Sequence, residues 1–69
     1  MSEYLINIGD SWINPRDVSY ITNNGKNIVY IHFKNKSDSL KINFIEDEDL
    51  NICDEMNIIA EQINKVLNM

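Results

Sequence analysis

Seven carboxylates stand between residues 46 and 61 of this 69-residue chain, with no Lys or Arg among them. They are Glu46, Asp47, Glu48, Asp49, Asp54, Glu55 and Glu61. The preceding 45 residues carry five bases and four acids, so the formal net charge of −5 arises in this acidic segment. Clustered carboxylates can hold a hard cation, act as an acid–base pair, or attract a basic partner.

Calcium binding is the first of these chemistries to fail. Asp47, Asp49 and Asn51 match the first three ligand positions of an EF-hand loop. The sixth position, which needs Gly for its turn, is Ile52, and the twelfth, which needs a bidentate Glu, is Ile58. We therefore expect no metal site here. Catalytic carboxylate pairs need an enclosed cleft that raises one pKa, and a solvated helix start provides no such cleft.

Two interpretations of the acidic segment remain. In the first, its carboxylates form a solvated surface that also suits the start of a helix. In the second, they form an acidic docking face for a basic protein partner. Seven carboxylates exceed what helix capping requires, which keeps the second interpretation open.

Few other side chains suggest chemistry. His32 is the single histidine, has no Ser or Cys nucleophile at a recognisable spacing, and is expected to be a structural or interface residue. Cys53 is expected to be a buried, inert thiol. Trp12 is expected to anchor the core, with a half-exposed contact residue as the alternative.

A nucleotide-like ligand at a subunit junction is the alternative function. Arg16 would contact phosphate, while Tyr20, Tyr30 or His32 would stack on the base. The β half has only one net positive charge and no glycine-rich phosphate loop, so this pattern is weaker than the acidic one. No activated nucleophile or acid–base pair can be assembled, so we expect a non-enzymatic protein that uses no cofactor.

The elements that position these residues follow from periodicity and turn signals. Alternating apolar residues predict strands at roughly 3–8, 11–13, 17–23, 27–34 and 40–45. Tyr4, Ile6 and Ile8 would share one strand face, and Gly9-Asp10 suits a two-residue hairpin turn. Val18 and Ile21 have opposite parity, which predicts a bulge or a redirecting turn near Pro15.

The clearest patterns follow residue 23. Asn24-Gly25 predicts a hairpin because both residue types tolerate positive φ. The strand at 27–34 is apolar on both faces, as expected of a central strand or a subunit contact. A helix is predicted at roughly 50–67, with Asn51 as its cap. Its apolar stripe comprises Ile52, Met56, Ile59, Ile63 and Val66, widened by Cys53, Ala60 and Leu67.

The chain resembles a group of small bacterial and phage proteins. Residues 12–21, Trp-Ile-Asn-Pro-Arg-Asp-Val-Ser-Tyr-Ile, and residues 31–35, Ile-His-Phe-Lys-Asn, carry the resemblance. Those proteins share an Ile-Asn-Pro-x-x-Val-x-x-Ile stretch, a hairpin, a further strand and a helix with an acidic start. The small flagellar protein FlbD is similar in overall pattern. The longer loop at 35–39 and the heavier acidic run distinguish this chain from FlbD, so no flagellar role carries over.

Composition limits the remaining choices. A core this small needs additional stabilisation. One cysteine cannot form an internal disulfide, and one His plus one Cys cannot supply the ligands of a structural zinc site. We therefore expect the chain to form a homodimer. An acidic chain is disfavoured as a direct binder of nucleic acid or of an anionic membrane. No signal peptide or spanning segment is recognised, which predicts a cytoplasmic protein. Asn and Ile, which have AT-rich codons, make up 23 of the 69 residues and suggest a low-GC bacterium or its phage.

Together these patterns predict an α+β fold, in which one C-terminal amphipathic helix packs on an antiparallel sheet of four to five strands. The expected function is that of a small acidic interaction protein. This composition would suit a phage inhibitor with an anti-defence role. Its carboxylates would imitate phosphate charge, so that it docks on a basic nucleic-acid-handling host protein.

Overall fold

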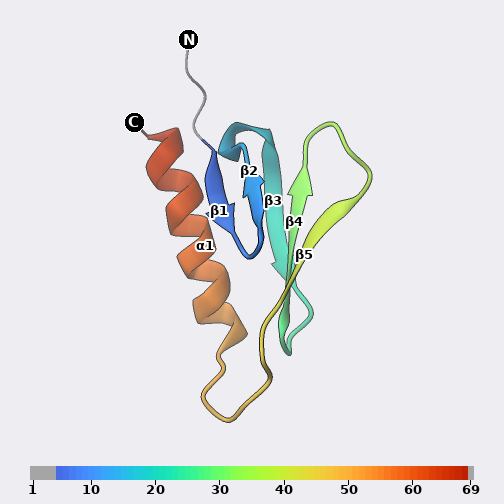
Figure 1. Cartoon of the computed structure of the whole chain (residues 1–69), viewed down its shortest axis with the longest axis vertical. Coiled ribbons are helices and arrows are strands. Elements are labelled where there is room, and N and C mark those ends of the chain that lie inside the picture. Colours follow the sequence, from blue (N-terminus) through green and yellow to red (C-terminus); the bar gives the residue numbers. More distant parts are fainter. Residues whose placement is uncertain (1–4, 69) are drawn as a thin grey trace.

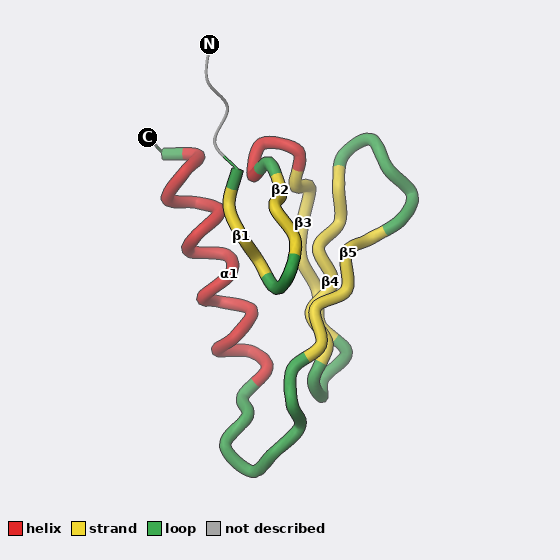
Figure 2. The backbone as a smooth tube through the Cα atoms, viewed as in Figure 1, coloured by secondary structure: helices red, strands yellow, loops and turns green. Residues whose placement is uncertain are grey.

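The fold of this protein is α+β, as predicted. The computed structural model describes residues 5–68, in which five strands precede one long helix (Figure 1). In chain order the elements are β1 (Ile6–Ile8), β2 (Ser11–Ile13), the 3-10 helix η1 (Pro15–Asp17), β3 (Val18–Asn23), β4 (Ile28–Phe33), β5 (Ser39–Asn43) and α1 (Ile52–Leu67). The strands form two antiparallel sheets, one of β1 and β2 and the other in the order β3-β4-β5 (Figure 2).

The observed bounds lie within one to three residues of most predictions. Asp17, predicted to begin a strand, belongs to η1, and the predicted strand at 40–45 is β5, one residue earlier at its start and two shorter at its end. Leu5 lies outside β1. The predicted strand positions 3 and 4, including the place of Tyr4, lie outside the described residues.

The two glycines allow two different turns. Gly9 has a φ of 62°, and the pairing of Ile8 with Ser11 leaves a two-residue loop, which confirms the predicted hairpin. The second loop, residues 24–27, is longer than the predicted two-residue turn. Gly25 has a φ of 80°, but Asn24 does not have positive φ. Asn24 organises this loop instead: its Oδ1 accepts hydrogen bonds from the backbone N–H groups of Lys26, Asn27 and Ile28 at 2.8–3.0 Å.

Strand β4 is central in the three-stranded sheet, which confirms the expectation from its two apolar faces. On one face Val29 and Ile31 are completely buried. On the other, Tyr30 and His32 are half-buried. The register with β3 shifts between Val18 and Tyr20, and this bulge accounts for the parity change in the sequence.

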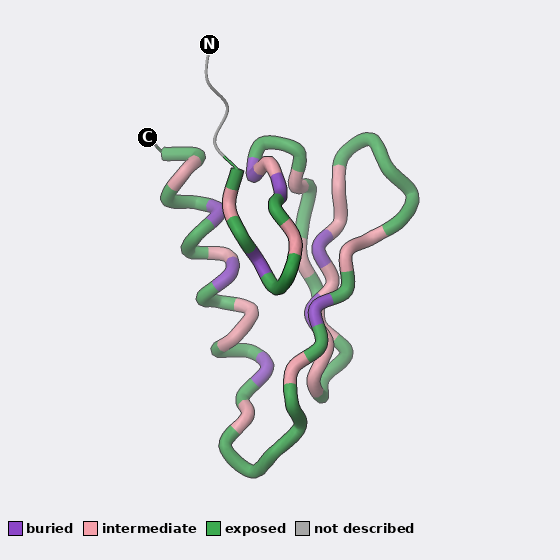
Figure 3. The backbone as a smooth tube through the Cα atoms, in the orientation of Figure 1, coloured by how far each residue is buried: buried purple, intermediate pink, exposed green. Residues whose placement is uncertain are grey.

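Helix α1 packs its apolar stripe on the strands and contacts β1, β3, β4 and η1 (Figure 3). The side chain of Asn51 caps the helix by accepting hydrogen bonds from the N–H groups of Cys53 and Asp54 at 3.1 and 3.2 Å. The predicted stripe is too wide, however. Cys53 and Leu67 are both exposed. A helix turns by 100° per residue, which places Cys53 beside the stripe rather than within it. Leu67 is the last residue of the helix.

The hydrophobic core joins both sheets and the helix. Its buried members are Ile8, Ile13, Val29, Ile31, Ile42, Ile52, Ile59 and Ile63. Every member except Val29 is an Ile, so stiff β-branched side chains fill almost the whole core.

Trp12 is not part of this core, contrary to prediction. It is 66% exposed, because it pairs with Asn7 across the β1–β2 hairpin and shares that residue's outward face. The inward face of the hairpin carries Ile8 and Ile13. The outward face carries the exposed residues Asn7 and Trp12.

Candidate partner-binding surface

The acidic segment begins in the loop that connects β5 to α1, residues 44–51, at the lower end of the molecule in Figure 1. Glu46, Asp47, Glu48 and Asp49 are all exposed there. Four consecutive carboxylates therefore face solvent at one end of the long axis.

Local hydrogen bonds give this loop a defined shape. Asp47 Oδ1 accepts a hydrogen bond from the backbone N–H of Asp49 at 2.9 Å. The backbone N–H of Leu50 donates to the carbonyl oxygen of Asp47 at 3.3 Å, and the side chain of Leu50 is half-buried. The turn thus depends on one carboxylate and one apolar anchor, not on the charge of its neighbours.

Two more carboxylates follow in the first turn of α1. Asp54 is exposed and Glu55 is half-buried. Both suit this position, because the partial positive charge of a helix N-terminus favours nearby anions. With the loop they form a continuous group, which we call the acidic end: Glu46, Asp47, Glu48, Asp49, Asp54 and Glu55.

Glu61 is separate from the acidic end. It lies seven residues after Asp54, about 10 Å further along the helix axis. Lys65 follows it by four residues, so a base lies on the same side of the helix as Glu61. The predicted acidic helix face is therefore a loop and one helix turn, and it does not extend along the helix.

Exposed aliphatic side chains border the acidic end. Ile45, directly before Glu46, is 85% exposed. Ile58 is 50% exposed and follows Asp54 by four residues, on the same side of the helix. Apolar side chains beside charges are typical of protein-binding surfaces.

The residues of the alternative ligand site lie elsewhere, on the face of the sheet opposite the core. Tyr20 and His32 stack with ring centroids 4.2 Å apart and planes inclined by 16°. Tyr30 lies beside His32, with centroids 6.4 Å apart. His32 Nε2 also forms a 2.9 Å hydrogen bond with Thr22 Oγ1. This sheet face gathers three of the four predicted residues.

Arg16 is not part of that aromatic group. It lies in η1, before the bulge that begins β3, and its backbone N–H donates to Asn14 Oδ1 at 3.0 Å. The described contacts of His32 are with Tyr20, Tyr30 and Thr22, so the predicted phosphate contact and the stacking surface belong to different parts of the fold.

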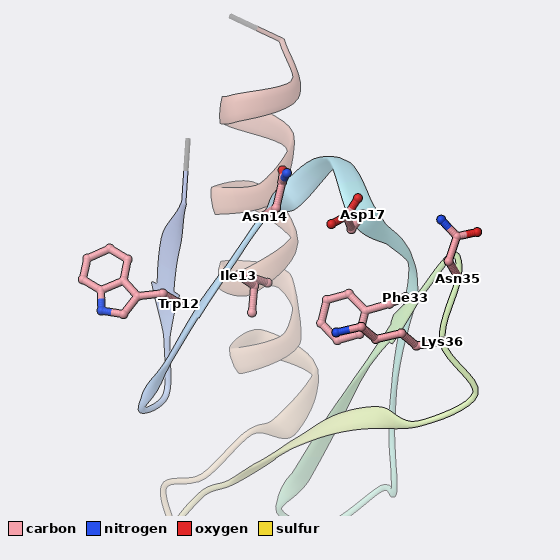
Figure 4. Close-up of a pocket in the computed structure, with 7 residues that line it drawn as sticks. All are labelled: Trp12, Ile13, Asn14, Asp17, Phe33, Asn35 and Lys36. Atoms are coloured by element: carbon pink, nitrogen blue, oxygen red, sulfur yellow. The ribbon is translucent and has the colours of Figure 1, made fainter. Parts of the chain in front are cut away.

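Sequence reasoning missed a cavity at the upper end of the molecule, between the β1–β2 hairpin, η1 and the loop after β4 (Figure 4). Its volume is about 210 Å³. Its lining residues are Trp12, Ile13, Asn14, Asp17, Phe33, Asn35 and Lys36. The signal available in the sequence was Pro15, which predicted a corner but not which residues would meet there.

Neither a metal cluster nor a membrane-spanning helix occurs in the part of the chain that the structure describes. Residues 5–68 contain no group of three or more His, Cys, Asp or Glu side chains arranged to hold a metal ion. Over the same range, no helix combines the length and apolar character that crossing a bilayer requires.

Comparison of the chain with protein-family models, with curated proteins and with solved structures yields no match. The resemblance to small bacterial and phage proteins, including FlbD, therefore stays a prediction. Inferences about function come from the surfaces described above.

Proposed function

We propose that this protein binds a basic protein partner through its acidic end. The observation that carries the proposal is the position of six carboxylates, four in one loop and two in the next helix turn, at one end of the molecule. Association of oppositely charged surfaces is fast and selective because the field steers the encounter.

The fold explains only half of this charge. Within residues 5–68, the side-chain hydrogen bonds of the loop and helix start use Asp47 and Asn51. Asp54 and Glu55 favour the helix N-terminus. Glu46, Glu48 and Asp49 add three exposed charges that raise self-repulsion without filling one of these structural roles.

The exposed aliphatic residues favour a protein partner. Ile45 and Ile58 offer apolar area that a phosphate backbone would not cover. A complementary surface would place a small apolar pocket among Lys and Arg side chains. Such a surface combines electrostatic steering with a desolvated centre.

The biological class that suits this surface is a phage inhibitor. Closely spaced carboxylates can imitate the phosphate charge of nucleic acid, so a basic nucleic-acid-handling host protein would be the target. The AT-rich codon usage implied by Asn and Ile agrees with a phage of a low-GC bacterium, and the site of action in this proposal is the bacterial cytoplasm. Blocking such a host protein would serve an anti-defence role.

A capture experiment with a charge-reversed variant and a control variant tests this proposal. The wild-type protein, a Glu48→Lys/Asp49→Lys/Asp54→Lys/Glu55→Lys variant and an Asp10→Lys/Asp38→Lys variant are used to capture proteins from lysates of low-GC bacteria. A specific partner should bind wild type and the second variant, fail to bind the first, and be displaced by duplex DNA. Capture that is identical for all three proteins would reject the acidic end as the binding surface.

The proposal includes a homodimer, because no strand among the described residues pairs with the outer edge of β5, and the sheet face of Tyr20 and His32 lies opposite the core. Pairing of one edge or face with its copy would enlarge a small core. Because Lys41 pairs with Tyr30, its exposed side chain stands on the aromatic face at the edge strand β5, where a face-to-face dimer would leave it at the rim of the contact. Sedimentation equilibrium should give twice the 8.1 kDa chain mass, and a monomer at all concentrations would remove the dimer.

A nucleotide-like ligand at the subunit junction is the second candidate function. The stacked pair of Tyr20 and His32 favours it, because aromatic rings on a sheet face can hold a base. A thermal-shift screen against nucleotides tests it, since a ligand specific to the folded state raises Tm. A rise that disappears in His32→Ala would support this candidate, and no rise with any nucleotide would eliminate it.

A further inference from the structure

The cavity between η1 and the β4–β5 loop is a site of its own, independent of the proposed partner binding. It lies at the opposite end of the long axis from the acidic end (Figures 1 and 4). Its volume of about 210 Å³ lies below the roughly 300–1,000 Å³ of sites for drug-sized ligands, and the exposed residues Asp17, Asn35 and Lys36 leave it open to solvent. The cavity therefore suits a small ligand.

Backbone hydrogen bonds fix the wall that carries Asp17. Its N–H donates to the carbonyl oxygen of Asn14 at 3.0 Å, and its own carbonyl oxygen accepts from the N–H of Lys34 at 2.8 Å. Pro15, within the same short helix, is completely buried. The second bond also joins η1 to the end of β4, so the two sides of the cavity are held together.

The cavity contains one charge of each sign. Asp17 contributes a carboxylate from η1, and Lys36 contributes an ammonium from the loop after β4. Lys36 Nζ lies over the ring of Phe33, 5.7 Å from its centroid. Figure 4 shows Asp17 apart from Lys36 on its own element, with Phe33 and Ile13 between the hairpin and the loop. Asn14 and Asn35 add amide groups to the lining.

These features argue against ligands held by aromatic stacking. The face of Phe33 nearest Lys36 is already taken by that ammonium, so a base has no vacant ring face there. Trp12 lines the cavity, but its indole ring is directed away from Phe33 and Lys36 in Figure 4. A sugar or a nucleobase would thus lack the flat contact it needs.

We propose that this cavity binds a small zwitterion, namely a free α-amino acid. The ammonium group of the ligand donates hydrogen bonds to the Asp17 carboxylate, and its carboxylate accepts from Lys36. Its side chain lies against Ile13, which with Phe33 forms the apolar part of the lining. Two opposite charges and a small volume together define the ligand class, because a simple amine or a simple acid would satisfy only one of the two groups.

Titration by NMR tests this proposal. The ¹⁵N-labelled protein is titrated with each of the proteinogenic α-amino acids, and with the decarboxylated amine and the deaminated acid of every amino acid that binds. At least one amino acid should shift the amides of Asn14, Asp17 and Lys36 saturably, with a Kd on the order of 1 mM or tighter. Its amine and acid analogues should bind about tenfold more weakly, since each loses one charge-assisted contact.

Variants distinguish this site from non-specific binding. Asp17→Asn and Lys36→Gln should each weaken binding on the order of tenfold, whereas Asp38→Asn and Lys26→Gln, which change the same charges outside the lining, should leave it unchanged. The same spectra report whether each variant is folded. No saturable shift at the cavity with any amino acid, or equal binding by the single-charge analogues, would overturn the proposal without affecting that for the acidic end.

Discussion

The side chain of Asp47 accepts a 2.9 Å hydrogen bond from the backbone N–H of Asp49, and this contact shapes the acidic loop from within. Asp47 is thus both a surface charge and a structural acceptor. Its neighbours Glu46, Glu48 and Asp49 are exposed carboxylates without that structural task in the described hydrogen bonds of the loop. Substitutions can therefore separate the shape of the loop from its charge.

Replacement of Asp47 should affect the loop according to the acceptor that remains. Asp47→Ala removes the acceptor, so the amide of Asp49 should exchange with solvent roughly fivefold faster, as expected for a hydrogen bond worth about 1 kcal/mol. Asp47→Asn retains an acceptor oxygen and should stay close to wild type. Hydrogen exchange measured by NMR gives both rates, and equal exchange in all three proteins would show that this contact does not order the loop.

The cap of α1 should contribute measurably to stability. Asn51→Ala removes the acceptor for the N–H groups of Cys53 and Asp54, which should lower the free energy of unfolding by about 1 kcal/mol. For a domain of this size the loss corresponds to a decrease in Tm of about 4–8 °C. Asn57→Ala is the control, because Asn57 is an exposed helix residue and Ala has the better helix propensity. Equal decreases in both variants would contradict the capping role.

The centre of the core should tolerate very little truncation. Ile31 is completely buried, so Ile31→Val should cost about 0.5–1.5 kcal/mol and Ile31→Ala about 2–5 kcal/mol. Because a small single core rarely supplies more than about 3–5 kcal/mol, the Ala variant should be largely unfolded. Urea denaturation followed by circular dichroism measures both effects. Ile45→Ala, at an exposed position, should change little, and a loss like that of Ile31→Ala would contradict this placement of the core.

The thiol of Cys53 should react in the folded protein. Its side chain is exposed on α1, so iodoacetamide should alkylate the native protein at a rate within a few-fold of that in urea. Mass spectrometry over time gives both rates. Protection by orders of magnitude in the folded protein would restore the buried, inert thiol that the helical stripe first indicated.

The sequence predicts the elements of this fold well because each has its own local signal. Apolar residues on both faces identify β4, alternation identifies β5, Gly9 identifies the first hairpin, and Asn51 identifies the start of α1. These signals depend on the backbone and on one or two neighbouring side chains. Their outcome does not depend on how the elements later pack.

Burial at the margins was harder to predict because it depends on how much surface the partner element covers. Cys53 borders the helical stripe, but the strands contact only a narrower strip of α1. Trp12 could have been placed correctly, since a two-residue turn at Gly9 pairs it with Asn7 rather than with an apolar residue. Its large apolar ring favoured a position in the core, but the register of the β1–β2 hairpin places it on the outward face.

The candidate sites show the same division. The acidic end lies within ten residues of sequence, so its charge was visible from the sequence alone, whereas its limit at Glu55 required the helix geometry. The cavity that contains Asp17 and Lys36 unites residues 19 positions apart. Sequence periodicity does not indicate that these two residues line the same cavity. Their proximity depends on the corner at Pro15 and on the path of the β4–β5 loop.

The most direct test of partner binding is the salt dependence of affinity for the captured partner, measured by calorimetry on matched variants. Glu48→Gln/Asp49→Asn and Asp10→Asn/Asp38→Asn remove two charges each, the first pair at the acidic end and the second elsewhere. Wild type and the second variant should bind alike and weaken steeply as salt rises, while the first variant should bind at least about tenfold more weakly at low salt with a shallower salt dependence. Equal affinity and equal salt dependence of all three proteins would contradict binding through the acidic end.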